Sequence, residues 1–486
     1  MNLESNDNKT FKTFLQLLAY SGHDSLLPRI EEAFQNAADF QKVCIGTSDT
    51  RQIYLCYLMS LAGSDHLKFQ LQPTLEDELQ TNLSSYSGNK YSAGDFETCE
   101  KAICSGKTIL CTMDSCNGII LETGNPQQRG LQQPQTENVI QGPMYSFNEN
   151  YQTNIALVRQ RMQTSRLKIW EVSIGEITKT KIGVLYLDGI TDPGLIQYTC
   201  DKISQIHTDG IQESGELLQL LNEKTGLFPA AVTTERPDRV SASLLNGKIV
   251  IVMDGTPFSI MAPGSFFDFW ESAEDQYLTP FIAVFLRTLR FMALMLNLFL
   301  PGFYVAITSV NIDINRLEIS LAAAAGREGV PYPVWIESML MLILLDCIVE
   351  AGVRLPRSIS STVTMVGGVV LGQAIIQANI VSNLLVIVAA TTALTNFIVV
   401  DYQMGLVQRI LKYFILIGAG VLGVLGIVFC FAILVICIAR VESFGVSYLT
   451  PIGPGARVRS RSLGLLGKSH HFSLTNWITF GKGMRK

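Results

Sequence analysis

The hydropathy of the chain changes at Pro280. Four long stretches beyond it are apolar: Phe291–Ser309, Ile359–Ile376, Ile380–Val400 and Leu411–Ala439. Each reaches or approaches the roughly 20 residues with which a helix crosses the hydrocarbon core of a bilayer, so these stretches are predicted to span a membrane. A fifth stretch, Pro333–Ile348, is shorter and carries Glu337 and Asp346. It is interpreted as a weaker span, re-entrant or buried among the other helices.

Residues 1–280 instead alternate between helical and strand patterns, which is typical of α/β or α+β domains. The predicted helices are Ser25–Ala37, Leu75–Leu83, Asn154–Gln163 and Pro193–Ile206, and the predicted strands are Ile53–Met59, Thr108–Met113, Leu167–Ile174 and Ile182–Leu187. The segment Arg51–Asp65 is similar in pattern to Lys181–Asp192. This similarity leads to the hypothesis of a duplicated subdomain.

A β-hairpin is predicted at 240–254, because Asn246-Gly247 separates two runs that are rich in strand formers. The expected fold class is a multi-domain membrane protein, in which a soluble N-terminal α/β region of two subdomains precedes an α-helical transmembrane bundle. The expected segments are a first α/β subdomain (1–115), a linker (116–150), a second α/β subdomain with the hairpin (151–280), a transmembrane helical domain (281–440) and a basic cytoplasmic tail (441–486).

The composition agrees with a membrane region. Apolar residues make up 48% of the 486 and charged residues 16%, whereas ordinary soluble domains carry about 25% charged residues. The net charge of −5 combines an acidic front, −13 over residues 1–280, with a basic tail, +7 over residues 440–486. Because no signal peptide is recognised and the tail is basic, both ends are expected in the cytoplasm, with an even number of crossings.

Motifs for catalysis or cofactor binding are missing from the sequence. It contains no Walker A, no G-x-G-x-x-G after a strand, no G-x-S-x-G and no H-E-x-x-H. We therefore expect neither an enzyme nor a cofactor, and the small net charge disfavours a nucleic-acid partner. Cys99, Cys104, Cys111 and Cys116 cluster, but their spacing differs from that of common zinc pairs, so buried thiols are expected there and not a metal site.

Ionisable residues within a membrane domain are costly and often functional. Glu337 and Asp346 are nine residues apart and fall on opposite sides of a helix. Asp346, Glu350 and Arg354 recur every four residues and share one face. That face is either a functional site or a structural ion pair at a helix end.

Uncharged polar residues and glycines form further sets. Gln373 and Gln377 share one helix face, and Thr391, Thr392, Thr395 and Asn396 follow on the next span. These groups either line a water-filled path or form hydrogen bonds between helices. Glycines permit close approach of helices, either between subunits or within one subunit, and they recur at Gly367, Gly368, Gly372, Gly418, Gly420, Gly423 and Gly426.

Several short motifs occur in a characteristic order along residues 125–455. They are Gln141–Pro143, Asn154–Arg161, Thr234–Arg239, Asp254–Phe258, Ala324–Pro331, Glu350–Pro356, Gly372–Ala374 and Ser443–Leu449. In this order they resemble the A subunit of GerA-type spore germination receptors. The resemblance extends more loosely over residues 24–115.

The resemblance implies a multi-pass protein in the inner membrane of the bacterial endospore, with its N-terminal region in the cytoplasm. The implied partners are a permease-like B subunit that binds the nutrient, a lipoprotein C subunit, the lipid bilayer and further copies of the chain. Such A subunits are thought to oligomerise into an ion-conducting pore that germinant opens. The resemblance implies no enzymatic activity and no catalytic, cofactor or metal residue.

Two sets of candidate residues follow. The structural motif set is Glu235, Arg236, Pro237, Asp238, Arg239, Asp254, Gly255 and Pro257. The membrane polar or pore set is Arg327, Glu328, Glu337, Asp346, Glu350, Arg354, Gly372, Gln373 and Gln377. Arg236 is expected to bond carboxylates or carbonyls and so to lock its loop to the hairpin.

The chain departs from the family pattern at a few positions. The family usually has charged residues at Gln133, Gln141 and Met144-Tyr145, a Tyr at Gln276 and a Pro near Val400. These changes remove charge from the linker and a kink from a span, so we expect either that assembly or gating differs from the family or that the receptor is degenerate. Two alternative functions stay open: a secondary transporter and a non-conducting scaffold for the B subunit. The repeated halves that are typical of transporters are not recognised in the sequence.

Overall fold

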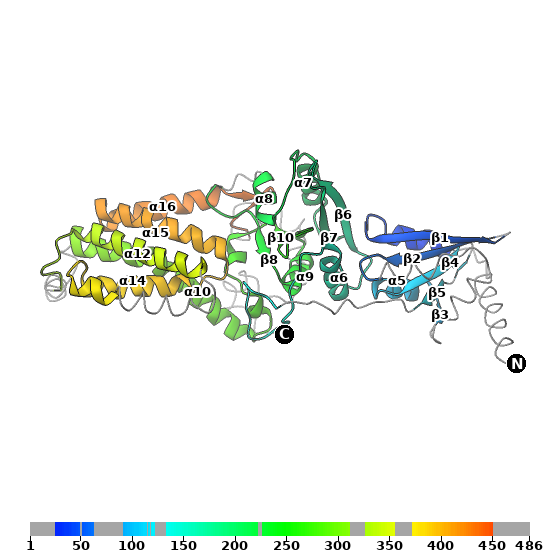
Figure 1. The fold of residues 1–486 in the computed structure, drawn as a ribbon, viewed down its shortest axis with the longest axis horizontal. Coiled ribbons are helices and arrows are strands. Elements are labelled where there is room, and N and C mark those ends of the chain that lie inside the picture. The colour runs from blue at the N-terminus through cyan, green and yellow to red at the C-terminus, as the bar shows by residue number, and fades with distance from the viewer. Residues whose placement is uncertain are drawn as a thin grey trace, which may run out of the picture. The chain divides into compact units, whose positions relative to one another are not determined.

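The structure is a computed structural model that describes residues 25–48, 51–62, 91–113, 115–116, 118–121, 133–221, 226–311, 326–354 and 372–450. The chain divides into two compact units, which are coloured blue to green and green to orange in Figure 1. The α/β unit contains residues up to 223 and residues 230–263, and the helical unit contains residues 224–229 and 264–453. The segment between Gly264 and Pro280 therefore belongs to the helical unit, whereas the sequence had placed it in the second subdomain.

The α/β unit is built from two five-stranded antiparallel sheets with the same strand order. The first sheet has the order β1-β2-β4-β5-β3, and its strands are β1 (Phe40–Ser48), β2 (Arg51–Leu58), β3 (Tyr91–Gly94), β4 (Thr108–Thr112) and β5 (Gly118–Leu121). The second has the order β6-β7-β9-β10-β8, and its strands are β6 (Leu167–Ile174), β7 (Thr180–Leu187), β8 (Val232–Thr234), β9 (Ile249–Met253) and β10 (Ser259–Ala262). The two strands whose sequences are similar, β2 and β7, hold the same place in the two sheets, as a duplication requires.

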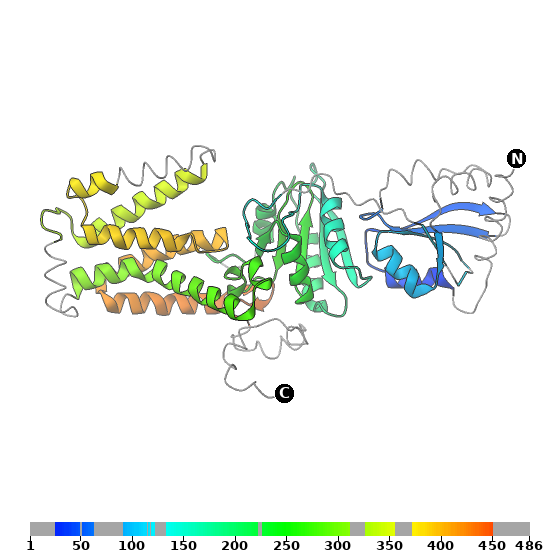
Figure 2. The same cartoon turned by 90° about the horizontal axis from the view of Figure 1, so that it is seen from below.

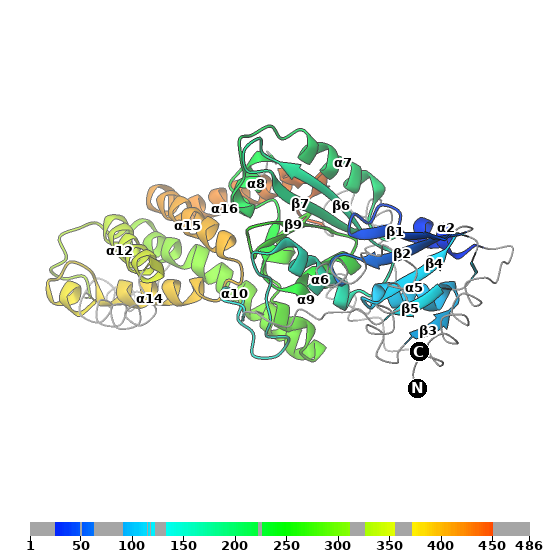
Figure 3. The same ribbon diagram turned by 45° about the vertical axis from the view of Figure 1, so that its right-hand side comes forward.

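Each sheet is packed against two helices that also correspond in chain order (Figure 3). These are α2 (Leu26–Ala33) and α5 (Phe96–Cys104) on the first sheet, and α6 (Tyr151–Arg161) and α9 (Pro237–Leu245) on the second. The second subdomain also contains α7 (Pro193–Ser204) and α8 (Ser214–Leu220). The apolar faces of α2 and α5 bury Ile30 and Ile103 against Ile109 of β4, which places the first core between helices and sheet.

The hairpin predicted at 240–254 is wrong. Its first half is the helix α9, its second half is β9, and Asn246-Gly247 ends the helix. Gly247 has a φ of +79°, and the N–H groups of Gly247 and Lys248 donate to carbonyls of the last helical turn at 3.0 and 3.1 Å. These are the two bonds of a Schellman C-cap, which uses the same Asn-Gly chemistry as a hairpin turn. The linker boundary also shifts, because β5 lies within the expected linker 116–150.

The long helices described in the helical unit (Figure 2) are α10 (Pro280–Val305), α12 (Val334–Arg354), α14 (Asn383–Asn396), α15 (Tyr402–Leu422) and α16 (Val424–Arg440). A π-turn, Ala306–Val310, extends α10. By length and composition, Pro280–Val310 and α15 are able to cross a membrane, and α14 and α16 are shorter apolar helices. Two short strands, β11 (Glu442–Ser443) and β12 (Val446–Ser447), follow α16.

The expected single span Leu411–Ala439 is two helices. Gly423, with a φ of +64°, separates α15 from α16. A Cβ atom on Gly426 would lie 1.9 Å from the carbonyl oxygen of Gly418, so the two helices touch through their backbones. For these two glycines, close packing within one subunit is the correct alternative. The stretch Pro333–Ile348, interpreted as a weak span, supplies from Val334 onward the larger part of the 21-residue α12. The predictions at Leu75–Leu83, Gly367 and Gly368 lie outside the described residues.

Candidate functional sites in the two units

The linker segment 136–143 is fastened to the second subdomain by the motif Thr234–Arg239. The Glu235 carboxylate accepts hydrogen bonds from the N–H and the hydroxyl of Thr136, at 2.5 and 2.8 Å, and from the N–H of Glu137 at 3.1 Å. Glu235 itself is buried, and a buried carboxylate needs such donors in place of the water that it has lost. The Glu235 carboxylate therefore fixes residues 136 and 137 of the linker to the second subdomain.

Arg236 is the centre of the same network and is fully buried. Its guanidinium donates two hydrogen bonds to Asp238, at 3.1 and 2.8 Å, and further bonds to the carbonyls of Glu137 and Pro143, at 3.3 and 3.1 Å. The arginine fork that the sequence predicted is present, but it holds the linker and not a hairpin. Pro237 forms the first turn of α9, where its missing N–H is harmless.

The remaining motif residues also act on neighbouring segments. Arg239 donates to the Glu137 carboxylate at 3.0 Å, and Thr234 donates to the other oxygen of that carboxylate at 2.9 Å. Asp254 accepts the Tyr151 N–H at 3.0 Å and so caps the start of α6. In the same motif, Gly255 has a φ of +86° and Pro257 is half-buried. The whole set joins the linker, α6 and the second sheet.

The two subdomains of the α/β unit meet at a buried ion pair that the sequence did not indicate. Arg159 of α6 donates to both oxygens of Asp39, at 3.0 and 2.7 Å, and both side chains are almost fully buried. Lys168 adds a hydrogen bond to the Ala33 carbonyl at 2.7 Å. Burial lowers the pKa of the Lys168 ammonium. Nothing in the local patterns of the sequence connects residues that are 120 positions apart.

The clustered cysteines belong to the first core. Cys99, Cys104 and Cys111 are buried there among aliphatic side chains, and Cys116 is half-buried. Burial raises the pKa of the Cys99 thiol to about 11 and that of Cys104 to about 12. Among the described residues, no group of three or more His, Cys, Asp or Glu side chains is arranged to hold a metal ion.

Two polar clusters occupy the helical unit, and the first surrounds Glu337 on α12. This buried carboxylate accepts the Ser382 N–H at 2.5 Å and lies 3.4 Å from the guanidinium of Arg327. The Ser382 hydroxyl is 2.9 Å from the hydroxyl of Tyr304 on α10. The cluster therefore ties α10, α12 and the start of α14 together, while Glu328 is exposed beside it.

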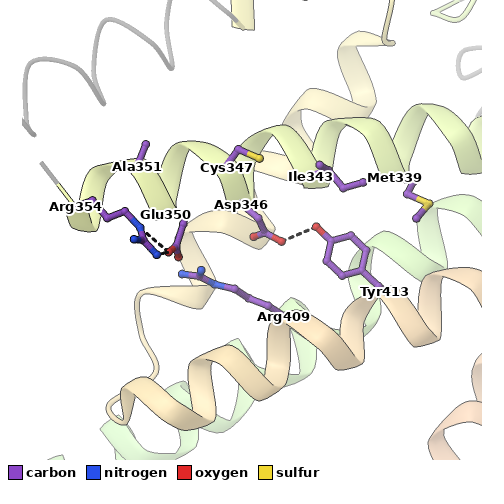
Figure 4. A pocket seen from close by; sticks show the side chains of 9 residues that line it. All are labelled: Met339, Ile343, Asp346, Cys347, Glu350, Ala351, Arg354, Arg409 and Tyr413. Atoms are coloured by element: carbon purple, nitrogen blue, oxygen red, sulfur yellow. Dashed lines mark hydrogen bonds and ion pairs between the residues drawn. The ribbon is translucent and has the colours of Figure 1, made fainter.

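The second cluster lies where α12 and α15 pack side by side (Figure 4). Asp346 accepts hydrogen bonds from Lys412 at 2.8 Å and from the Tyr413 hydroxyl at 2.5 Å. Glu350 and Arg354 form an exposed pair on the next turns of α12 at 2.8 Å. The three residues share a face as the sequence predicted, but the partners of Asp346 come from α15. The sequence did not predict Lys412 as a partner of Asp346.

The set Gly372, Gln373 and Gln377 lies on a short helical segment, 372–377, with both glutamine side chains exposed. A Cβ atom on Gly372 would meet nothing within 4 Å. Close packing within the described chain therefore gives no reason for a glycine here.

Two buried amides were missed in the sequence. Gln408 on α15 is 1% exposed, and neither polar atom of its side chain has a hydrogen-bond partner. Asn297 on α10 donates to the Thr392 carbonyl and to Asn396, but its own oxygen is unpartnered. The feature of the sequence that could have revealed Gln408 and Asn297 is a single amide within an apolar stretch.

The hydroxyl groups of Thr391, Thr392 and Thr395 bond to carbonyls of their own helix.

Comparison with known proteins identifies the family. The profile described as "Bacillus/Clostridium GerA spore germination protein" matches residues 28–463, which include most of both units. The chain belongs to this GerA family. The resemblance found in the motifs is therefore confirmed.

Relatives in the GerA family carry names from spore germination. "Spore germination protein B1" of Bacillus subtilis (strain 168) is 32% identical over 447 residues, which are 87% of this chain and 92% of the relative. "Spore germination protein A1" of the same organism is 32% identical over 441 residues, 89% and 90% of the two chains. "Spore germination protein GerLA" of Bacillus cereus is 34% identical over 354 residues, 73% and 72% of the two chains.

One solved structure is also similar. It is the N-terminal domain of the A subunit of the Bacillus megaterium spore germinant receptor GerK3, which aligns at 24% identity and a TM-score of 0.37. The alignment covers 50% of this chain and 98% of that domain.

Proposed function

We propose that this GerA family protein is the A-type membrane subunit of a nutrient germinant receptor in the inner membrane of the endospore. The match over residues 28–463 carries the proposal, because it includes both the α/β unit and the helical unit. In this role the helical unit is embedded in the bilayer and the α/β unit stays in the cytoplasm. A permease-like B subunit and a lipoprotein C subunit are the proposed partners. No catalytic step is part of the proposal.

The proposed mechanism is ion conduction through an oligomer of the chain. Exposed Gln373 and Gln377 share one helix face, and the glycine beside them packs against no described residue. A lipid-facing helix has no use for exposed amides, whereas a subunit contact or an aqueous path gives them hydrogen-bond partners. Gly372 supplies the closely approachable backbone that such a contact uses.

Ion flux from liposomes tests this mechanism. The full chain, co-reconstituted with its B and C subunits, should release entrapped ions when germinant is added. Gly372→Leu should abolish the flux because the leucine blocks close approach. Gly405→Leu is the matched control, since a Cβ atom on Gly405 also meets nothing within 4 Å. It should keep the flux. A fully assembled complex without flux would instead make the chain a scaffold for the B subunit.

A further inference from the structure

An open groove runs between α12 and α15 and has a volume of about 670 Å³, within the range of ~300–1,000 Å³ that is typical of ligand sites. Figure 4 shows its lining, which comes from both helices. Most of the lining belongs to α12, and α15 adds Arg409 and Tyr413.

The α12 side of the groove carries two parallel stripes. Met339, Ile343, Cys347 and Ala351 recur every four residues and form an apolar stripe. From residue 339 to residue 351 the stripe is about 18 Å long at ~1.5 Å per residue. One leaflet of a bilayer has about half of a ~30 Å hydrocarbon core, so the stripe is as long as one acyl layer.

The second stripe of α12 is charged and consists of Asp346, Glu350 and Arg354. The helix α15 adds the cations Arg409 and Lys412, and one of the cations has no carboxylate partner. Asp346 is bound by Lys412 and Tyr413, and Glu350 is bound by Arg354. Arg409 forms no ion pair with any described residue, and its Nε atom is buried without a hydrogen-bond partner. Three cations thus face two carboxylates around the groove. The surplus positive charge lies at Arg409, whose side chain points from α15 toward α12 in Figure 4.

The charged end of the groove is also the end of the bundle where a head group would lie. α12 and α15 are antiparallel, since Trp335 lies next to Gly420 while Asp346 binds Lys412. The C-terminus of α12 is therefore level with the start of α15. Arg409 is seven residues, or about 10 Å, into α15, and a long arginine side chain reaches from that depth to the interface.

We propose that this groove binds an anionic phospholipid, with its phosphate at Arg409 and one acyl chain along the apolar stripe of α12. Guanidinium groups bind phosphate with paired hydrogen bonds, and basic pockets between membrane helices are known to select anionic head groups. The inference rests on the proposed function only in placing the helical unit in a membrane.

Thermal unfolding of the purified full chain in neutral detergent tests the inference. Phosphatidylglycerol should raise the unfolding temperature more than phosphatidylcholine with the same acyl chains. Arg409→Gln should remove this difference and weaken the apparent lipid affinity by about tenfold or more, as expected for the loss of a charged hydrogen bond. Arg440→Gln, which removes an exposed cation at the end of α16 and outside the groove, should keep the difference.

Other results would overturn the inference. They are equal effects of the two lipids on the unaltered chain, an equal effect of water-soluble glycerol phosphate, or an Arg409→Gln variant that changes oligomer size while still distinguishing the lipids. The last result would make the groove a contact between copies. Membrane fractionation separates this outcome from failure of the proposed function. A chain released from membranes without detergent would contradict both, whereas a chain that needs detergent but ignores phosphatidylglycerol contradicts only the lipid site.

Discussion

The α/β unit and the helical unit treat their buried polar groups differently. In the described α/β unit, two buried side-chain polar atoms lack a hydrogen-bond partner, one on Gln152 and one on Arg161. In the described helical unit there are nine, of which two belong to the Arg327–Glu337 ion pair. Buried polar groups are normally satisfied, because an unpaired one costs free energy. The described α/β unit is thus almost fully hydrogen-bonded within itself, whereas the described helical unit leaves polar atoms that water, an ion, lipid or another subunit would have to satisfy.

The largest expected effect comes from breaking the network of the α/β unit. Arg236→Ala leaves Asp238 buried without its counter-ion and should lower the free energy of unfolding by about 3–5 kcal/mol. The matched control is Asp95→Ala at the corresponding strand-to-helix junction of the first subdomain. There the carboxylate caps α5 through the Thr98 N–H and is exposed, so the loss of stability should be clearly smaller.

Denaturant unfolding of the full chain, followed by a probe in the α/β unit, measures both variants. Equal losses would show that the Arg236 network is no more than a helix cap. A normal stability of Arg236→Ala together with loss of the nutrient response would make the motif a signalling contact.

Loose packing of the helical unit is an alternative explanation for its unpartnered polar groups, and two of its glycines test it. Gly426→Ala places a methyl group against the Gly418 carbonyl and should cost about 1–3 kcal/mol, as overpacking does. Gly372→Ala meets no neighbour, so it should be neutral or stabilise the helix by up to about 1 kcal/mol. Thermal unfolding in detergent compares the two variants. If Gly426→Ala were tolerated, loose packing would explain the unpartnered groups and the comparison would fail.

Two buried tyrosines provide a third test of the difference between the two units. Tyr151 in the α/β unit donates its hydroxyl to Glu171 at 3.1 Å, and Tyr151→Phe should cost about 1 kcal/mol. Tyr448 in the helical unit packs among Phe228, Phe266 and Phe269, and its buried hydroxyl has no partner. Tyr448→Phe should therefore leave the stability unchanged or increase it slightly. A larger loss for Tyr448→Phe than for Tyr151→Phe would contradict the account.

The smallest effect concerns thiols and requires no substitution. Alkylating reagents attack the thiolate, so a raised pKa slows the reaction at a given pH. With a pKa of about 11, only about one Cys99 thiol in a thousand is ionised at pH 8. Mass spectrometry of the native chain at pH 8 should find exposed Cys44 alkylated well before Cys99 and Cys104. Fast labelling of Cys99 or Cys104 would mean that the first core opens readily.

The regular elements of the α/β unit were predictable because their periodicity is local. Leu167–Ile174 is the strand β6 as predicted, and Pro193–Ile206 contains α7. Asn246-Gly247 misled the prediction because a left-handed glycine ends helices as well as turning hairpins. The choice depends on whether Val240–Leu245 packs as a helix, and only the tertiary structure decides that.

The candidate sites were predictable as residue types but not as partners. The sequence pattern grouped Asp346, Glu350 and Arg354 correctly, because helical spacing fixes which residues share a face. It did not reveal that Lys412 pairs with Asp346 or that Asp39 pairs with Arg159, because residues that are far apart in the sequence leave no local pattern. Gln408 was overlooked for the same reason: its significance lies in having no partner within the fold.

The central claim is that the exposed amides of the helical unit line an ion path. The direct measurement is the germinant-induced current of the reconstituted receptor, recorded while a charged, water-borne thiol reagent is applied. The chain would carry Gln373→Cys or Gln377→Cys, with Cys347 and Cys437, the exposed cysteines described in this unit, replaced by serine. Leu384→Cys, at an exposed apolar position of α14, serves as the control. The account predicts that the reagent reduces the current at both glutamine positions and not at Leu384. A current that the reagent leaves unchanged at Gln373 and Gln377 would contradict it.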